Sequence, residues 1–321
     1  MNSIAAPIFG LRQFPWLRKH GFAVRLGVCF LSIASITVAV ESIEQWRPEN
    51  SPVWVANGLL LAFLLLAPRW RWPAYLLTGF LALSVRSVLD HARSDEFLLY
   101  NALNILEVTV GALLLRRRST VLPRFTERAY LIRFFGYAVL AGPALAGGIL
   151  ALVFLFWAHP APPHPFLGWM TADSLGIAIA TPAFAAVLQT RFRNTLDWRR
   201  NWIYPAILLG ITIAAFAQNR VPLIYLIYPL LVLVVVRLGL GYASLFTILA
   251  AATAEWLTIC GYGPFAAESF ISPAMPSLHL QAAVASAIML VYGISVVLER
   301  QKATERRLQE TVSLHRLVSP S

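Results

Sequence analysis

Hydrophobic residues in this chain are grouped into long runs that are separated by short polar or turn-forming gaps. We count about ten such runs, many of them near the roughly 20 residues that an α-helix needs to cross a bilayer. Their approximate limits are 21–43, 52–68, 71–88, 96–115, 129–157, 168–190, 202–218, 221–237, 240–260 and 278–298. The pattern predicts an all-α, polytopic bundle of about ten transmembrane helices. Eight spans is the alternative, because only Asn219 and Arg220 separate the seventh and eighth runs, which would then form one re-entrant element.

The basic residues give these spans an orientation. Of the 26 Lys and Arg residues, all but Arg47, Arg86, Arg93 and Arg220 lie in or next to alternate gaps, counting both chain ends as gaps. Basic loops remain in the cytoplasm when a membrane protein inserts. The sequence therefore predicts that both termini are cytoplasmic and that the protein is a multi-pass protein of the inner (plasma) membrane.

The composition excludes a water-soluble fold. Hydrophobic residues make up 58% of the chain and charged residues only 13%, about half the usual share in a globular protein. The net charge of +11 is split into short clusters instead of one continuous stripe, so we expect no nucleic acid partner. We expect these clusters to attract the anionic head groups of membrane lipids.

The chain divides into three parts. A basic cytoplasmic segment (1–20) precedes the membrane domain (21–298), and a charged tail (299–321) follows it. The tail is rich in helix formers, so we expect it to continue the last span as one cytoplasmic signalling helix. Leu308 and Val312 give it only a weak apolar stripe, which leaves open whether two copies form a homodimer through it.

Polar and ionisable side chains inside the spans are the candidates for function, because they are costly in lipid and usually serve a purpose. The candidates for binding a ligand or receiving a signal are Asn57, Asn101, Asn104, Glu107, Asp173, Glu255 and Gln281. By the predicted topology, all of them except Asn104 and Glu107 are placed in the outer half of the membrane. We therefore expect a polar cavity or network that lies open to, or just below, the outer face. The alternative is that these groups pair privately, for example Asp173 with Arg86, and only hold the helices together.

Glu107 is the most informative of these residues. It follows Asn104 by three residues, and Asn104 follows Asn101 by three, so the three side chains lie close on one helical face. A carboxyl group in the middle of the membrane is expected to be protonated or paired, because an isolated charge there is too costly. Glu107 is therefore either a proton-linked switch or a neutral acid that binds Asn104 or a neighbouring helix.

The sequence offers little support for other kinds of site. Cys29 and Cys260 lie at different depths, so we expect no disulfide, and the six histidines show no spacing typical of a metal site. The chain contains no P-loop, no GxSxG, no HExxH and no dinucleotide-binding GxGxxG motif. We therefore expect no catalytic residues, no metal and no cofactor.

Three stretches of the sequence carry a recognisable combination of motifs. They are VWVANGLLLAFLLLAPRWRWPAYLLTGFLA, NALNILEVTVGALLLRR and WMTADSLGIAIATPAF. The order of these stretches, their spacing and the side of the membrane on which their ends are predicted to lie resemble the MASE1 domain, a bacterial integral membrane sensory domain of signalling proteins. The matching positions are Trp54, Gly58, Trp72, Pro73, Gly79, Asn101, Glu107, Gly111, Trp169, Asp173, Leu175, Gly176, Thr181 and Pro182.

The resemblance implies a function. In this family the membrane domain is an N-terminal sensor joined to cytoplasmic outputs such as diguanylate cyclases, phosphodiesterases and histidine kinases. We therefore expect a sensory module that passes a stimulus through its last helix to a cyclic-di-GMP enzyme or a histidine kinase, in cis or in trans. The sequence contains no GGDEF, EAL or H-box motif, so it is either a stand-alone module or the sensory part of a longer protein. A proton-coupled transporter or channel is the alternative, because a carboxyl at mid-membrane also suits a carrier.

Overall fold

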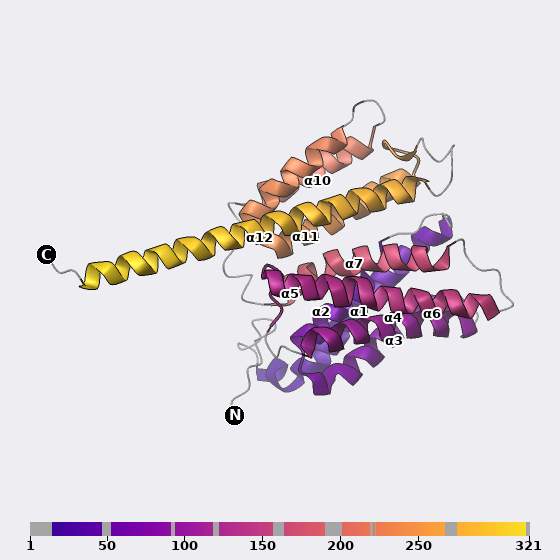
Figure 1. The fold of residues 1–321 in the computed structure, drawn as a ribbon. Helices are drawn as coiled ribbons and strands as arrows, with labels where there is room; N and C mark the ends of the chain where they lie inside the picture. The colour runs from indigo at the N-terminus through magenta and orange to yellow at the C-terminus, as the bar shows by residue number, and fades with distance from the viewer. Residues whose placement is uncertain are drawn as a thin grey trace.

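The structure is a computed structural model that describes residues 15–46, 53–90, 94–117, 122–156, 164–189, 201–218, 221, 223–266 and 275–318. The described chain is a bundle of helices (Figure 1), and these ranges contain no β-strand. The all-α fold predicted from the hydrophobic runs is therefore confirmed.

The helical elements follow the predicted runs along the chain. They are α1 (Pro15–Trp46), α2 (Ala56–Leu66), η2 (Arg69–Arg71), α3 (Trp72–Leu89), α4 (Ser94–Arg116), α5 (Arg128–Arg133), η3 (Phe134–Ala141), α6 (Gly142–Phe156), α7 (Pro165–Leu188), α10 (Ile203–Phe216), η4 (Leu223–Leu226), α11 (Ile227–Ile259) and α12 (Met275–Val318). α5, η3 and α6 follow one another directly and form one long element, whose middle part, η3, is a π-helix. π-Helical segments are frequent at functional sites.

The number of long spans is smaller than predicted. Within the described ranges, seven helices are long and apolar enough to cross a membrane. Two further apolar helices, α2 and α10, have only 11 and 14 residues. Seven long helices are fewer than the predicted number of about ten spans, and α2 and α10 correspond to two of the predicted runs. The two runs that the eight-span alternative joins, 202–218 and 221–237, form separate helices, because α10 ends at Phe216 and α11 begins at Ile227. The runs 221–237 and 240–260 lie in one long element, Leu223–Ile259.

α11 nevertheless reverses its direction at Gly239. This glycine has φ +77° and ψ 176°, a backbone conformation that is essentially restricted to glycine and that interrupts the helix. Tyr228 before the glycine and Ala250 after it line the same cavity. In a straight helix these two residues would be about 33 Å apart, so the two halves of α11 must lie side by side.

α2 lies at the centre of the first part of the bundle. Every residue from Ala56 to Leu65 is buried, and α1, α3, α4 and α7 pack around the helix. A helix that is enclosed by protein is apolar on all sides, which explains the sequence ANGLLLAFLLL. Because α2 is enclosed by other helices, it need not be long enough to span the lipid by itself.

α10, α11 and α12 form the second part of the bundle, and α11 packs against α7. α12 has 44 residues and extends well beyond the other helices (Figure 1). Its residues 299–311 are all exposed. The prediction that the tail continues the last span as one helix is confirmed.

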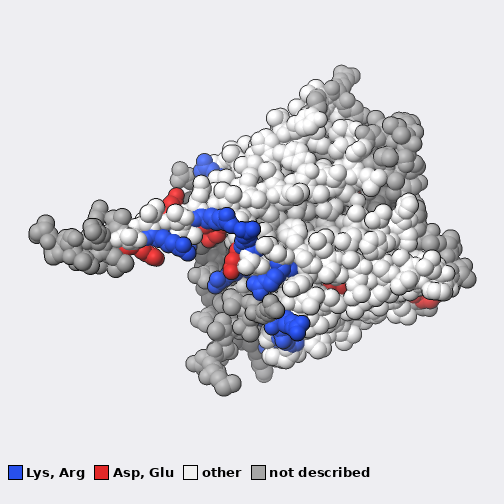
Figure 2. Space-filling view, in the orientation of Figure 1, with Lys and Arg blue, Asp and Glu red and all other residues white. Residues whose placement is uncertain are grey.

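Basic residues gather at the end of the bundle from which α12 projects. Figure 2 shows Lys and Arg concentrated there, with some Asp and Glu among them, and a broad surface over the rest of the visible face that is uncharged apart from small acidic patches. By the positive-inside rule, this end faces the cytoplasm. The uncharged surface is what helices in contact with lipid tails require.

Candidate functional site

Buried polar side chains from α2, α4 and α7 meet inside the bundle. The Asn57 Nδ2 atom lies 2.6 Å from Asn104 Oδ1, 2.5 Å from Glu107 Oε1 and 2.8 Å from Asp173 Oδ1. The exposed fraction is 0% for Asn57 and Glu107 and 4% for Asp173. We call these four residues, together with Trp169, the polar cluster.

Small residues let α2 approach α7 closely enough to form the cluster. A Cβ atom on Gly176 would overlap the carbonyl oxygen of Trp54, and a Cβ on Gly58 would lie 2.6 Å from the Ala180 Cβ. The Trp54 backbone N–H donates a hydrogen bond of 3.1 Å to the carbonyl of Ala172, directly before Asp173. The entrance to α2 is therefore fixed against the turn of α7 that carries Asp173.

The other side of the cluster is closed by aromatic residues and by α6. The Trp169 indole Nε1–H donates a hydrogen bond of 2.9 Å to Glu107 Oε2. The Tyr100 ring stacks on the Trp169 ring, with centroids 5.9 Å apart. A Cβ on Gly142 would lie 2.9 Å from the Glu107 carbonyl oxygen, so α6 packs tightly on the backbone of α4.

The polar cluster places more hydrogen-bond acceptors than donors around the Asn57 amide. The Asn57 amide has two hydrogens but faces three acceptor oxygens. The carboxyl groups of Glu107 and Asp173 are themselves within hydrogen-bonding reach of each other. Two buried carboxylates without a proton between them would repel strongly in a medium of low dielectric constant. A proton on one of the two carboxyl groups would remove this repulsion and would supply a further donor.

The candidate residues predicted from the sequence separate into three places. Asn57, Asn104, Glu107 and Asp173 come together in the polar cluster. Asn101 instead donates a hydrogen bond of 3.0 Å to Ser84 Oγ on α3. Glu255 and Gln281 lie on α11 and α12, next to Ala254 and Leu280, which belong to a separate hydrophobic cluster with Phe216.

Two carboxyl groups that were expected at different depths meet at one amide. Glu107 was placed at mid-membrane and Asp173 in the outer half, but both carboxyl groups contact the same Asn57 amide. The alternative in which Asp173 pairs with Arg86 also differs from the ion pair that Arg86 forms. Arg86 Nε lies 2.7 Å from Asp90 Oδ2.

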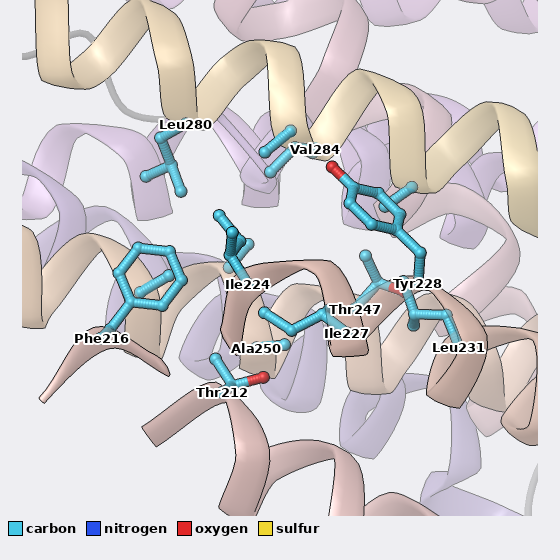
Figure 3. A pocket seen from close by; sticks show the side chains of 14 residues that line it. Thr212, Phe216, Ile224, Ile227, Tyr228, Leu231, Thr247, Ala250, Leu280 and Val284 are labelled. Atoms are coloured by element: carbon cyan, nitrogen blue, oxygen red, sulfur yellow. The ribbon is translucent and has the colours of Figure 1, made fainter. Parts of the chain in front are cut away.

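Of the polar cavity or network expected from the sequence, the structure shows a network, in which Asn57 and Glu107 are fully buried. A cavity lies elsewhere, between α10, α11 and α12, and is lined mainly by apolar side chains such as Phe216, Leu231 and Val284 (Figure 3). The Thr212 and Thr247 hydroxyls at its wall each donate to a carbonyl of their own helix. No group of three or more His, Cys, Asp or Glu residues in the described ranges is arranged to hold a metal.

The remaining motif residues build the packing around the cluster. The Trp72 indole N–H donates to the Leu64 carbonyl at 2.8 Å, which ties α3 to the end of α2, and Pro73 lies in the first turn of α3. A Cβ on Gly79 would meet the Leu60 side chain, and one on Gly111 would meet Ala138 of η3. These positions act by allowing close helix contacts.

Sequence reasoning missed a contact between α7 and α12. Pro182 lies inside α7 and has no N–H, so the carbonyl of Ala178, four residues earlier, lacks its helical donor. The Tyr292 hydroxyl from α12 donates to this carbonyl at 2.9 Å. The proline in the sequence indicated the unpaired carbonyl, but nothing in the sequence indicated its partner.

Comparison with known proteins agrees with this architecture. The MASE1 family profile matches residues 22–302. The protein named "Probable diguanylate cyclase DgcE" of Escherichia coli (strain K12) is 29% identical over 157 residues, which cover 47% of this chain and 14% of that protein. No solved structure matches. The chain, whose described part is a helical bundle with seven helices able to cross a membrane, belongs to the MASE1 family of integral membrane sensory domains.

Proposed function

We propose that this chain senses a stimulus at the polar cluster and passes it through α7 and α12 to a cytoplasmic output domain. The observation that carries the proposal is the hydrogen bond from Tyr292 of α12 to the Ala178 carbonyl of α7. Asp173 precedes Ala178 by five residues, which is about 7.5 Å along the helix axis. A displacement of α7 at Asp173 would therefore be transmitted to α12 through a short, rigid segment of helix.

The polar cluster has the properties of a two-state element. Asn57 Oδ1 has no hydrogen-bond partner within the described chain, while Nδ2 faces three acceptors. If a second proton reaches the carboxyl pair, the acids become donors, and the amide must turn its oxygen towards them. Buried networks are sensitive to such changes because each unpaired polar group is costly at low dielectric constant. The two arrangements would hold α2, α4 and α7 at different separations.

The α12 helix is the proposed output element. Tyr292 is followed without interruption by the exposed residues 299–311, which extend beyond the bundle (Figure 1). A rotation or shift at Tyr292 therefore reaches the tail without a flexible joint. We assign residues 1–20 to a cytoplasmic segment, 21–298 to the sensor and 299–321 to the connecting helix. Pairing of two tails in a homodimer is part of this proposal.

The output we propose is a cyclic-di-GMP enzyme, with a histidine kinase as the second type. The name of the Escherichia coli relative, a probable diguanylate cyclase, supports the first type. Because the match covers only 14% of that protein, its activity belongs to this chain only as a proposal. The output is supplied either in the same polypeptide or by a separate partner.

A chimaera tests the proposal. Residues 1–315 are fused in helical phase to a diguanylate cyclase domain, and cyclic-di-GMP is measured for the parent and for Asp173→Ala and Glu107→Ala. Cyclic-di-GMP production that changes in either variant, with a normal amount of protein in the membrane, supports a sensory function. Unchanged output in both variants contradicts it, and Glu107-dependent proton uptake in vesicles would then favour a transporter.

A further inference from the structure

Two half-buried arginines lie next to each other at the cytoplasmic end of α1 and α3. Arg25 is one turn inside the span Gly21–Ile43, and Arg71 is the last residue of η2. The Nε atom of each guanidinium is buried and has no hydrogen-bond partner in the described chain. The two guanidinium groups are also close enough to repel one another. An arginine at this depth ordinarily has an anionic partner or a carbonyl to bind.

The surrounding sequence supplies no acid for these arginines. The chain has no Asp or Glu between residues 1 and 40, and none between residues 51 and 89. At the same end, Glu127 pairs with Arg124 at 3.6 Å. Arg116, which is close enough to Arg69 to repel it, uses its own NH2 group for the Ala67 carbonyl. The protein therefore gathers positive charge here without a matching carboxylate from α2, from α3 or from the first 26 residues of α1 (15–40).

Aromatic rings hold Arg71 at the level of the membrane surface. The guanidinium carbon lies 4.7 Å from the centroid of the Phe22 ring and 4.5 Å from that of Trp70. Trp70 is 72% exposed, and tryptophan at a span end is typical of the interface between lipid tails and head groups. Stacking on a ring uses the face of the guanidinium, so its N–H bonds still point outward in the plane, where they can donate to an acceptor.

We propose that Arg25 and Arg71 form a binding site for the phosphate of an anionic phospholipid in the cytoplasmic leaflet. Guanidinium groups bind phosphate oxygens with charge-assisted, paired hydrogen bonds. A lipid head group fits better than a free anion because Arg25 lies inside the span and Trp70 is exposed at the interface, where acyl chains are in contact with the protein. A bound phosphate offsets the repulsion between the two arginines and clamps α1 against α3.

The test is a titration of the delipidated full chain in a neutral detergent with phosphatidylglycerol, with bound lipid counted by native mass spectrometry. The test variant is Arg25→Gln/Arg71→Gln. The control is Arg124→Gln/Arg128→Gln, which removes the same charge from exposed residues at the same end. Phosphatidylcholine and inorganic phosphate serve as competing ligands, and circular dichroism checks that each variant is folded. Arg25→Lys/Arg71→Lys is a second test variant that keeps the charge.

We expect phosphatidylglycerol to bind in preference to phosphatidylcholine, and the test variant to weaken this binding by about 25-fold, at roughly fivefold for each arginine. The control should stay within about twofold. The Lys/Lys variant should retain charge-based binding but lose part of the preference, because lysine does not form paired bonds to phosphate. Equal weakening in test and control variants, or no weakening in the test variant, would overturn the site. Displacement of the lipid by inorganic phosphate at millimolar concentration would overturn its assignment to a lipid.

Discussion

Tyr292 on α12 donates a hydrogen bond to the carbonyl of Ala178 on α7, although 114 residues separate them in sequence. The carbonyl is available because Pro182 cannot donate to it. Inside a membrane, a carbonyl without a donor is costly, so a neighbouring helix has reason to satisfy it. The bond therefore joins the helix that carries Asp173 to the helix that leaves the membrane.

Removing the Tyr292 hydroxyl should lower the free energy of unfolding more when Pro182 is present than when it is replaced. Tyr292→Phe is expected to reduce the free energy of unfolding by about 0.6–1.7 kcal/mol, the range for hydrogen bonds between membrane helices. In a Pro182→Ala background, residue 182 provides the missing N–H, and the same change should have a smaller effect. A double-mutant cycle of unfolding in detergent measures the difference. Equal losses in both backgrounds would contradict this account of the bond.

Replacing Glu107 by glutamine should destabilise the protein less than replacing it by alanine. Glu107→Ala leaves the buried Asn57 amide and the Trp169 indole N–H short of an acceptor, which is expected to lower the free energy of unfolding by about 1–3 kcal/mol. Glu107→Gln keeps an acceptor and a donor at the site, so a smaller loss is expected. Thermal unfolding followed by tryptophan fluorescence compares the two, with Glu299→Ala in the exposed part of α12 as the control. Similar losses for Glu107→Gln and Glu107→Ala would argue against a hydrogen-bonding role.

The contact between α2 and α7 should be sensitive to a single methyl group. Gly176→Ala places a Cβ against the Trp54 carbonyl oxygen and should lower the free energy of unfolding by about 1–3 kcal/mol or more. Gly168→Ala on the same helix is the matched control, since a Cβ there has nothing within 4 Å. It should be neutral or slightly stabilising, because alanine favours helix over glycine. A similar loss in both variants would show that the close approach is absent.

The native cysteines test the orientation of the bundle. Cys260 follows α11 and is exposed, whereas Cys29 in α1 is buried. With both termini in the cytoplasm, Cys260 lies at the outer side. A membrane-impermeant maleimide added to intact spheroplasts should therefore label the wild type and leave Cys260→Ser unlabelled. Labelling that occurs only after the membranes are opened would reverse the orientation.

The helical elements could be predicted from the sequence because each hydrophobic run is a local property of the chain. Gly239 shows both the strength and the limit of this approach. The boundary predicted between 221–237 and 240–260 coincides with a real change of direction. The lengths of the spans were less predictable, since α2 is short and enclosed by other helices, an arrangement that depends on tertiary packing.

The polar cluster could be predicted only in part. The spacing of Asn101, Asn104 and Glu107 placed them on one side of α4, but residues six apart in a helix differ by about 120° in direction. Asn101 therefore faces Ser84 on α3, while Glu107 faces Asn57 and Trp169. Glu255 shows that residues predicted at the same depth need not belong to the same site.

The central claim is that the state of the polar cluster reaches the output through the bond between α7 and α12. The most direct measurement is cyclic-di-GMP production by the chimaera of residues 1–315 in four forms: the parent, Asp173→Ala, Tyr292→Phe and the double variant. The account predicts that Asp173→Ala changes output in the parent and has little further effect once Tyr292 is phenylalanine. An effect of Asp173→Ala that is equally large in both backgrounds, at equal membrane levels, would contradict it.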